Sequence, residues 1–259
     1  MKKTALITGA SGGIGYELAR LFAKNGNNLV LVARSADKLN DLALELRKLY
    51  GTETFVMAKD LSHYQVAQEI FDLCTLQKIQ VDYLVNNAGF GDFGFFHESQ
   101  WTRQEQMINL NITTLTYLTR LFVEGMVKRG SGRIMNVAST AAFQPGPTMS
   151  VYYATKAYVL SFSEALSNEL SDKGITVTAL CPGATESGFQ DKAAMQESKL
   201  VKGKKLPTSA EVAAYGYKAM MHGKVVAIHG FRNAVMATSV RFTPRALVRK
   251  IVRTLQDKA

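Results

Sequence analysis

Short runs of aliphatic and β-branched residues alternate along the chain with longer stretches of helical periodicity. The short runs are continuously apolar rather than alternating, which is typical of parallel strands covered by helices on both faces. We expect strands at Thr4–Thr8, Asn28–Ala33, Thr54–Met57, Tyr83–Asn86, Arg133–Val137, Thr176–Cys181 and Val225–Ile228. The pattern predicts an α/β fold with a doubly wound parallel sheet of about seven strands and helices on both faces.

The segments between these strands carry helix-start signals and three irregular stretches. Ser62-x-x-Gln65 and Thr208-x-x-Glu211 are capping-box patterns that precede apolar periodicity. The irregular stretches follow the fourth, fifth and sixth strands, at Phe90–Gln100, Ala141–Ser150 and Gly183–Pro207. Ligands of open α/β sheets bind outside the carboxyl ends of the strands, so we expect these loops to border the functional site.

Composition and charge narrow the class of protein. The net charge of +10 is concentrated in residues 230–259, which sum to +6, and residues 196–205, which sum to +3. A nearly neutral body without a reading module argues against a nucleic-acid-binding protein. Cys74 and Cys181 are too few and too far apart for a disulfide framework or a metal site. Because no window holds the roughly 18–20 apolar residues of a membrane-spanning helix, we expect a cytoplasmic protein.

A glycine-rich turn joins the first strand to the first helix, with the sequence Thr8-Gly9-Ala10-Ser11-Gly12-Gly13-Ile14-Gly15. Glycines here allow the backbone to approach a pyrophosphate, and the helix N-terminus attracts the anion, as in a Rossmann-type fold. About twenty residues further on, an acid would hold a free ribose 2′-hydroxyl, whereas arginine accommodates a 2′-phosphate. Ala33 and Arg34 stand there. NADP(H) is therefore expected rather than NAD(H).

Tyr152 and Lys156 are candidate proton-transfer residues, four apart in a helical stretch, so that their side chains share one face. A neighbouring ammonium, together with the positive nicotinamide of an oxidised cofactor, should lower the phenol pKa from its ordinary value of about 10. Ser139 comes just after the fifth strand, where its hydroxyl can donate to a substrate oxygen.

The ordered set of motifs resembles the short-chain dehydrogenase/reductase family, in its short single-domain branch. The resemblance covers roughly residues 3–230. It rests on the glycine turn, Asp60-Leu61, Asn86-Asn87-Ala88-Gly89, Asn111, Ser139, Tyr152, Lys156 and Pro182-Gly183. Family resemblance also implies a homodimer or homotetramer.

The resemblance implies a role for each matching position. Tyr152 would be the general acid in carbonyl reduction and the base in alcohol oxidation, with Lys156 lowering its pKa and holding the nicotinamide ribose. Ser139 would polarise the carbonyl, and Asn111 would support a proton-relay water. The cofactor contacts would be Gly9, Ser11, Gly13, Ile14, Gly15, Arg34, Asp60, Leu61, Asn87, Ala88, Gly89, Tyr152, Lys156, Pro182 and Gly183, with Thr185 or Ser187 as a further hydroxyl. Gly12 departs from many NADP-specific relatives, which carry Lys or Arg there.

These residues predict an NADP(H)-dependent oxidoreductase that interconverts a ketone or aldehyde and the corresponding alcohol. The site loops are apolar, which favours a hydrophobic substrate such as a 3-oxoacyl derivative, a steroid-like ketone or an aryl ketone. The apolar loop residues are Phe90, Phe93, Phe95, Phe96, Phe143, Met149 and Phe189. The alternative is a dinucleotide-binding regulatory or interaction protein without turnover.

Residues 231–259 form a basic extension beyond a cofactor-binding and catalytic domain of residues 1–230. Thr243-Pro244 is a good helix start. The following helix would carry an apolar stripe of Leu247, Ile251 and Leu255, flanked by Val248 and Val252, and the charges of Arg245, Arg249, Lys250 and Arg253. Such a helix can dock on the domain or a second subunit, or lie on an anionic membrane surface, and the sequence leaves these outcomes open.

Overall fold

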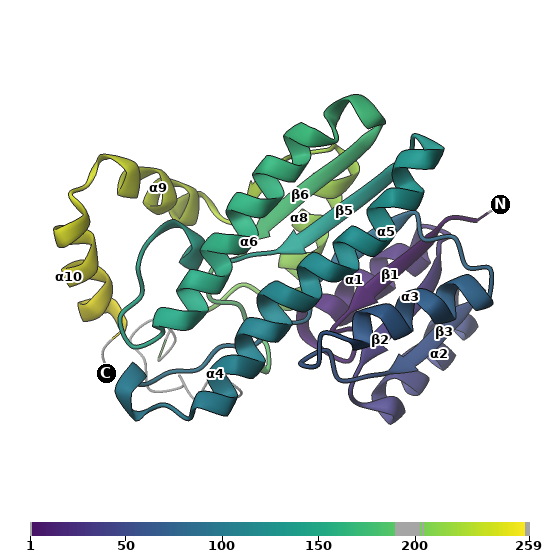
Figure 1. Cartoon of the computed structure of the whole chain (residues 1–259), viewed down its shortest axis with the longest axis horizontal. Helices are drawn as coiled ribbons and strands as arrows, with labels where there is room; N and C mark the ends of the chain where they lie inside the picture. The colour runs from purple at the N-terminus through teal and green to yellow at the C-terminus, as the bar shows by residue number, and fades with distance from the viewer. Residues whose placement is uncertain (1, 190–202, 204, 257–259) are drawn as a thin grey trace.

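Seven parallel strands form one sheet in the order β3-β2-β1-β4-β5-β6-β7 (Figure 1). This computed structural model describes residues 2–189, 203 and 205–256. The strands are β1 (Thr4–Thr8), β2 (Asn28–Ala33), β3 (Thr54–Ala58), β4 (Tyr83–Asn86), β5 (Gly132–Val137), β6 (Ile175–Cys181) and β7 (Val226–Ile228). The predicted strands are confirmed, each within one residue of its expected ends, and every pairing is parallel.

Helices cover both faces of the sheet, which confirms the predicted doubly wound α/β fold. One face carries α1 (Gly13–Lys24), α2 (Ala36–Tyr50) and α8 (Ser209–Met221). The other carries α3 (Val66–Leu76), α5 (Leu115–Arg129) and α6 (Ser150–Glu169). The remaining helices are α4 (Trp101–Ile108), α9 (Phe231–Ser239) and α10 (Arg245–Gln256). Short segments complete the chain: η1 (Phe96–Glu98), the π-helical η2 (Asn109–Thr114), η3 (Thr140–Phe143), η4 (Ser171–Lys173) and η5 (Val240–Phe242).

The first strand shows why the strands read as continuous apolar runs. Successive side chains of a strand point to opposite faces of the sheet. Ala5 and Ile7 pack with α1, α2 and α8, whereas Leu6, between them, packs with α3 and α5. All three are fully buried. Two apolar cores therefore hold the sheet, one on each face, so successive positions of β1 are apolar.

One of the two predicted capping boxes is present. Thr208 Oγ1 accepts a hydrogen bond from Glu211 N–H, and the Glu211 carboxylate accepts one from Thr208 N–H, so α8 begins as expected. The pattern at Ser62 does not cap α3, which begins at Val66 without a side-chain cap. Ser62 instead donates through both its hydroxyl and its N–H to Asp60 Oδ1. The prediction at Ser62 was wrong because the Ser62 hydroxyl and N–H both donate to the Asp60 carboxylate instead of capping α3.

The residues after β7 form two helices, of which α10 was expected from the sequence and α9 was not. Val248, Val252 and Gln256 of α10 are buried, and the two valines pack with Tyr152 and Tyr153 (Figure 1). The predicted stripe of Leu247, Ile251 and Leu255 lies beside this buried face and remains exposed. Among the described residues, no helix has the length and apolar character required to cross a bilayer.

Candidate active site

The glycine turn is packed on one side and open on the other. Gly9 and Gly13 have φ of 67° and 57°, values that L side chains rarely adopt. A Cβ at Gly9 would lie 2.8 Å from Asn87 Nδ2, and a Cβ at Gly15 would overlap the same amide and the Gly9 carbonyl. Gly12 has nothing within 4 Å of its Cβ position. The turn therefore needs glycine on its inner side and leaves its outer side free for a pyrophosphate, which fits a dinucleotide.

Hydrogen bonds hold this turn against the end of β4. Thr8 Oγ1 accepts from the N–H groups of Asn87, at 2.9 Å, and Ala88, at 3.0 Å. Asn87 Nδ2 donates back to the Thr8 carbonyl at 2.9 Å. Because β1 and β4 adjoin where the strand order reverses, this contact forms the switch point at which such sheets bind ligands. Ser11 and Ile14 of the turn are half-buried beside it.

Arg34 and Asp60 stand close together at the ends of β2 and β3. Arg34 is exposed, and its positive charge acts on the Asp60 carboxylate. Burial opposes ionisation of Asp60, but the hydrogen bonds from Ser62 and the Arg34 charge hold its pKa below the ordinary value. Asp60 is therefore a carboxylate at neutral pH. The Leu61 carbonyl, next in sequence, accepts a hydrogen bond from Thr114 Oγ1 at 2.8 Å, which ties this end of β3 to η2.

Tyr152 and Lys156 lie on the buried face of α6, as their spacing predicts. They are 8% and 5% exposed, and the Lys156 ammonium is 5.8 Å from the centroid of the Tyr152 ring. Lys156 Nζ donates to the Val137 carbonyl at 2.7 Å, at the end of β5. Ser139 follows that strand. Its hydroxyl donates to the Pro182 carbonyl at 3.4 Å and lies near enough to the Tyr152 phenol to favour its ionised form. The three predicted catalytic side chains therefore meet at one place.

Burial dominates the electrostatics of this group. It raises the pKa of Tyr152 well above the ordinary value, and the nearby Ser139 hydroxyl opposes the rise only in part. It lowers the pKa of Lys156 to about 8. In the chain by itself, burial therefore outweighs the influence of Ser139 on the phenol pKa, whereas the expected lowering also involves the positive nicotinamide of a bound cofactor. The reason is that both ionised forms lose hydration in the same buried space.

Asn111, the fourth predicted catalytic residue, lies in the π-helical segment η2. Its Nδ2 donates to the Phe90 carbonyl and to Thr155 Oγ1, both at 3.0 Å. A Cβ at Gly89 would lie 3.0 Å from Asn111 Oδ1 and 3.5 Å from Lys156 Nζ. Gly89 thus lies between the side chains of Asn111 and Lys156, and a larger side chain at this position would crowd both. π-helical turns are frequent at functional sites, and this one aims the Asn111 amide at the loop after β4.

Sequence reasoning did not single out a buried polar network beneath the site. Asn86 Nδ2 donates to Asn136 Oδ1 and Thr119 Oγ1, each at 2.9 Å. Asn136 Nδ2 continues the chain to Ser163 Oγ at 2.9 Å. These bonds tie β4 and β5 to α5 and α6, and so fix the strand ends that carry Asn87 and Ser139. The available signal was an asparagine inside each of two otherwise apolar strands.

Apolar side chains wall the space beside Tyr152. A Cβ at Gly91 would lie 3.0 Å from both Met149 Cε and Phe189 Cζ, and 3.2 Å from the Tyr152 ring. The Tyr152 and Phe189 ring centroids are 5.4 Å apart. Of the other predicted loop aromatics, Phe90 and Phe93 pack in this cluster. Phe143 packs instead with Leu115, Ala138 and Val159, and Phe95 and Phe96 are exposed.

Helix α10 closes the same wall, which sequence reasoning did not foresee. Val248 and Val252 join the cluster that contains Met149, Tyr152 and Tyr153. At the end of the helix, Gln256 Nε2 donates to the Tyr153 phenol oxygen at 2.6 Å. The substrate side of the site is therefore built partly from the C-terminal extension.

The segment after β6 lies between the glycine turn and the C-terminal helices. The Pro182 carbonyl accepts from Thr140 N–H at 2.9 Å, and a Cβ at Gly183 would lie 2.6 Å from the Asn233 amide of α9. Thr185 Oγ1 donates to the Gly183 carbonyl at 3.0 Å. Ser187 lies against the turn, with its Cβ 3.5 Å from the Cβ position of Gly13. Of the two candidate hydroxyls, that of Ser187 rather than that of Thr185 is the one beside the glycine turn.

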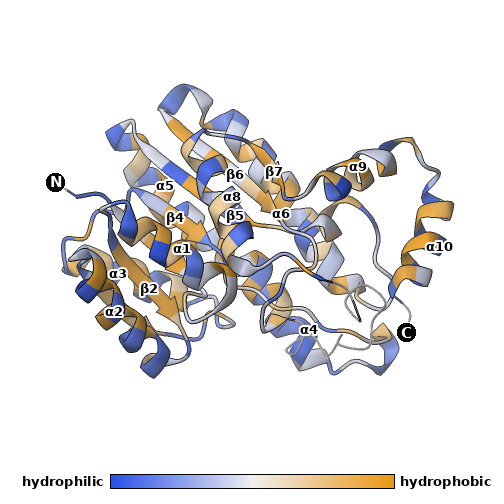
Figure 2. Cartoon of the chain, turned by 180° about the vertical axis from the view of Figure 1, so that it is seen from behind, coloured by the Kyte–Doolittle hydropathy of each residue, from blue (hydrophilic) through white to orange (hydrophobic). Residues whose placement is uncertain are grey.

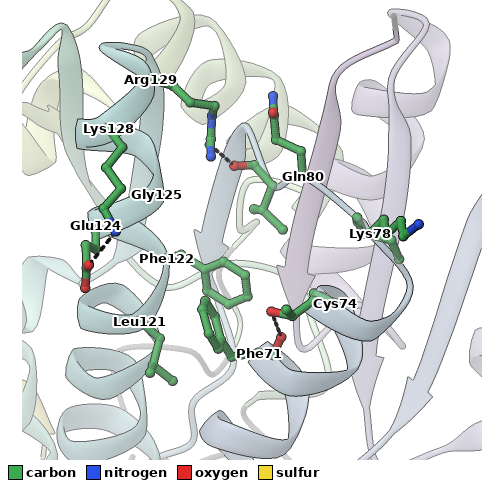
Figure 3. A pocket seen from close by; sticks show the side chains of 13 residues that line it. Phe71, Cys74, Lys78, Gln80, Leu121, Phe122, Glu124, Gly125, Lys128 and Arg129 are labelled. Atoms are coloured by element: carbon green, nitrogen blue, oxygen red, sulfur yellow. Dashed lines mark hydrogen bonds and ion pairs between the residues drawn. The ribbon is translucent and has the colours of Figure 1, made fainter.

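A surface hollow of about 580 Å³ lies away from these residues, between α3 and α5 (Figure 3). Its walls include Phe71, Cys74 and Phe122, and Arg129 donates across its edge to the Val81 carbonyl at 2.9 Å. Val81 precedes β4, so the hollow is at the opposite end of the sheet from Tyr152. Within the described ranges, no group of three or more His, Cys, Asp or Glu side chains could hold a metal ion.

Residues 3–198 match the sequence profile of the short chain dehydrogenases. The chain is 35% identical over 184 residues to very-long-chain 3-oxoacyl-CoA reductase of Anas platyrhynchos, covering 69% of this chain and 58% of that protein. It is 35% identical over 184 residues to 17-beta-hydroxysteroid dehydrogenase type 3 of Mus musculus, covering 70% of this chain and 60% of that protein. These matches span about three fifths of each relative.

Solved structures agree with this assignment. A short-chain dehydrogenase from Sphingobium yanoikuyae in complex with NADPH has a TM-score of 0.85 and 32% identity, covering 95% of this chain and 94% of that chain. The bulky-bulky ketone specific alcohol dehydrogenase from Comamonas testosteroni has a TM-score of 0.79 and 30% identity, covering 93% and 92%. The profile, the sheet order and the likeness to these enzymes agree. The chain belongs to the short-chain dehydrogenase family.

Proposed function

We propose that the protein is an NADPH-linked reductase of a hydrophobic ketone or aldehyde, with oxidation of the corresponding alcohol as the reverse reaction. The observation that carries the proposal is the buried Tyr152 phenol. It lies beside Ser139 and is enclosed by Met149, Phe189 and α10. A substrate oxygen placed between the two hydroxyls would have an apolar body resting on that wall.

The chemistry that a bound nicotinamide dinucleotide supplies is hydride transfer to or from the carbon that carries the oxygen. In reduction, Ser139 donates a hydrogen bond to the carbonyl oxygen and Tyr152 gives that oxygen a proton, so the carbonyl becomes a hydroxyl group on the same carbon. The resulting phenolate is stabilised by the Lys156 ammonium, which lies on the same face of α6. Asn111 holds the loop after β4 beside Lys156 and positions a path for the proton that restores Tyr152.

Preference for NADP(H) is supported by the charge at the end of β2. Arg34 is exposed there and can pair with a 2′-phosphate, while Asp60 can accept from the adenine amino group. The outer side of the glycine turn has room at Gly12. The Sphingobium enzyme with the same fold binds NADPH. Gly9, Ser11, Gly13, Ile14 and Gly15 are proposed to hold the pyrophosphate, with Ser187 beside them.

The substrate class follows from the wall beside Tyr152. Met149, Phe189, Val248 and Val252 pack around Tyr152 and carry no charge. We propose a 3-oxoacyl-, steroid- or aryl-ketone-like compound. The relatives act, by their names, on very-long-chain 3-oxoacyl-CoA, on 17-beta-hydroxysteroids and on bulky-bulky ketones.

The test is oxidation of NADPH against a panel of apolar ketones and 3-oxoacyl thioesters, followed by absorbance. Turnover with at least one bulky ketone, with NADH far less effective, supports the proposal. A chain that binds NADPH but turns over none of the panel would instead be the regulatory or interaction protein that remains as the alternative. The close approach of Ser139, Tyr152 and Lys156 favours the enzyme, because a protein without turnover has no use for all three.

We also propose a division of the chain, an assembly and a location. Residues 1–230 would form the cofactor-binding and catalytic domain, and residues 231–259 an extension that completes the substrate side. A homodimer or homotetramer is proposed from the family, and light scattering after gel filtration measures it. The two buried free cysteines, Cys74 and Cys181, suit the reducing cytoplasm, which cell fractionation would test.

A further inference from the structure

The C-terminal lobe, defined as residues 230–256, carries an unusual amount of exposed apolar surface. Phe231 is 84% exposed and Phe242 83% exposed. Along α10, Leu247, Ile251 and Leu255 are 48%, 47% and 43% exposed. Figure 2 shows that α9 and α10 stand beside the main body of the molecule, with apolar residues on their ribbons. Exposed apolar residues gathered on one lobe mark an interaction surface rather than scattered surface positions.

Helix α10 divides its apolar residues between two uses. Val248 and Val252 face the catalytic domain and are buried. The stripe Leu247, Ile251 and Leu255 points about 100° away from them around the helix axis. An α-helix that only needed to dock on the domain would require the first face alone. The second face is left for a partner outside the domain.

The charge of the lobe indicates which partner. Residues 230–256 contain six arginines and lysines and no aspartate or glutamate. They are Arg232, Arg241, Arg245, Arg249, Lys250 and Arg253. A second copy of the chain, paired through the same surface, would bring two such basic sets together and would be repelled. A partner with an apolar interior and a negatively charged surface complements both the exposed apolar residues and the basic residues of the lobe.

We propose that the C-terminal lobe is a peripheral membrane-binding surface that places the Leu247, Ile251 and Leu255 stripe in the outer acyl region of an anionic bilayer. Basic side chains beside the stripe, such as Lys250, would reach the lipid phosphates. The adjacent face of the same helix, which carries Val248 and Val252, packs in the cluster around Tyr152. Binding therefore brings the substrate side of the site close to the bilayer, where apolar ketones concentrate. This inference goes beyond the proposed reaction and does not depend on it.

The experiment is co-sedimentation of the full chain with vesicles of phosphatidylcholine alone or of equal parts phosphatidylcholine and phosphatidylglycerol, at low and high salt. We expect binding to the anionic vesicles at low salt, weakened at high salt by screening. The triple variant Leu247→Ser/Ile251→Ser/Leu255→Ser should bind at least tenfold more weakly. Lys250→Gln, which removes the basic side chain nearest to the stripe, should lose about fivefold.

The control is Leu44→Ser/Leu49→Ser on α2, where two exposed leucines lie on a helix whose three basic residues are balanced by three acidic ones. This variant should bind vesicles as the wild type does. Circular dichroism and light scattering report on the fold and oligomer mass of every variant. Absence of wild-type binding to anionic vesicles at low salt overturns the proposal. It is equally overturned if the stripe variant lowers the oligomer mass without altering vesicle binding, because the stripe then contacts a second copy.

Discussion

The side-chain amide of Gln256 donates a hydrogen bond of 2.6 Å to the phenol oxygen of Tyr153, the residue that follows Tyr152. Gln256 is fully buried, and its Oε1 lies 3.4 Å from Thr148 Oγ1 as an acceptor. Two polar groups that would be costly to bury alone thus satisfy each other beneath the last turn of α10. The bond ties the C-terminal extension to the segment that carries the predicted catalytic tyrosine.

Gln256→Leu should loosen this part of the site without abolishing chemistry. The substitution leaves the buried Tyr153 hydroxyl without its donor, which costs about 1–3 kcal/mol of unfolding free energy. We expect a raised KM for bulky ketones and a smaller change in kcat, because α10 supplies wall and not reacting atoms. Urea unfolding and steady-state kinetics measure both effects. Gln106→Leu, at an exposed position of α4, is the control and should change neither.

Tyr152→Phe and Tyr153→Phe should separate the two adjacent phenols. Loss of the Tyr152 hydroxyl removes the proposed general acid and should lower kcat by roughly 10²–10⁴-fold, with NADPH affinity retained. Tyr153→Phe loses only the bond with Gln256 and should keep kcat within about tenfold, since neutral hydrogen bonds contribute about 1 kcal/mol. Kinetics and fluorescence titration with NADPH report the two quantities. Equal kcat losses in both variants would remove the catalytic assignment of Tyr152.

Much of the fold could be predicted from the sequence because it depends on what each residue needs locally, such as burial or a positive φ. Burial on both faces makes the interiors of β1 and β2 continuously apolar, between Thr4 and Thr8 and after Asn28, and these runs marked both strands to the residue. Positive φ at Gly9 and Gly13 makes glycine the favoured residue at the turn. The meeting of Ser139 with Tyr152 followed from the rule that functional groups gather at the carboxyl ends of parallel strands.

The parts that were missed depend on contacts between distant segments. Gln256 and Tyr153 are separated by 103 positions, and no local pattern marks either one as half of a pair. Phe143 has the same loop setting as Met149, yet it packs against α5 and α6 residues because η3 turns it away. Ser62 fits a capping box by sequence, but Asp60 competes for its donors. Each of these outcomes was decided by a neighbour that the spacing does not reveal.

Arg34→Ala should weaken NADP(H) binding while NAD(H) binding changes little. The exposed guanidinium would make a charge-assisted contact with the 2′-phosphate, which contributes about 1.5–3 kcal/mol, or roughly ten- to a hundredfold in Kd. NAD(H) lacks that phosphate and has no contact to lose. Titrations with NADPH and NADH give the two affinities. Arg47→Ala, at the exposed far end of α2, is the control. If both cofactors lose affinity equally, Arg34 has another role.

The pH dependence of stability should report the burial of Lys156. Its pKa is lowered from 10.5 to about 8 in the folded protein. Between those values the unfolded chain binds more protons than the folded chain, so the free energy of unfolding rises with pH. The cost of the buried ammonium is fully present below pH 8 and disappears as the pH approaches 10.5.

Lys156→Met removes the titrating ammonium, so the difference between wild type and variant isolates the contribution of Lys156 to the pH dependence of unfolding. Relative to the variant, wild type should gain about 2 kcal/mol of unfolding free energy between about pH 7.5 and about pH 9.5. The raised pKa values of Tyr152 and Tyr153 destabilise the folded state only above about pH 10, and both proteins share those phenols. Urea unfolding followed by circular dichroism at the two pH values gives the difference. Parallel pH dependence in wild type and variant would mean that the Lys156 ammonium keeps its hydration, and so stands further from Tyr152 than the 5.8 Å found here.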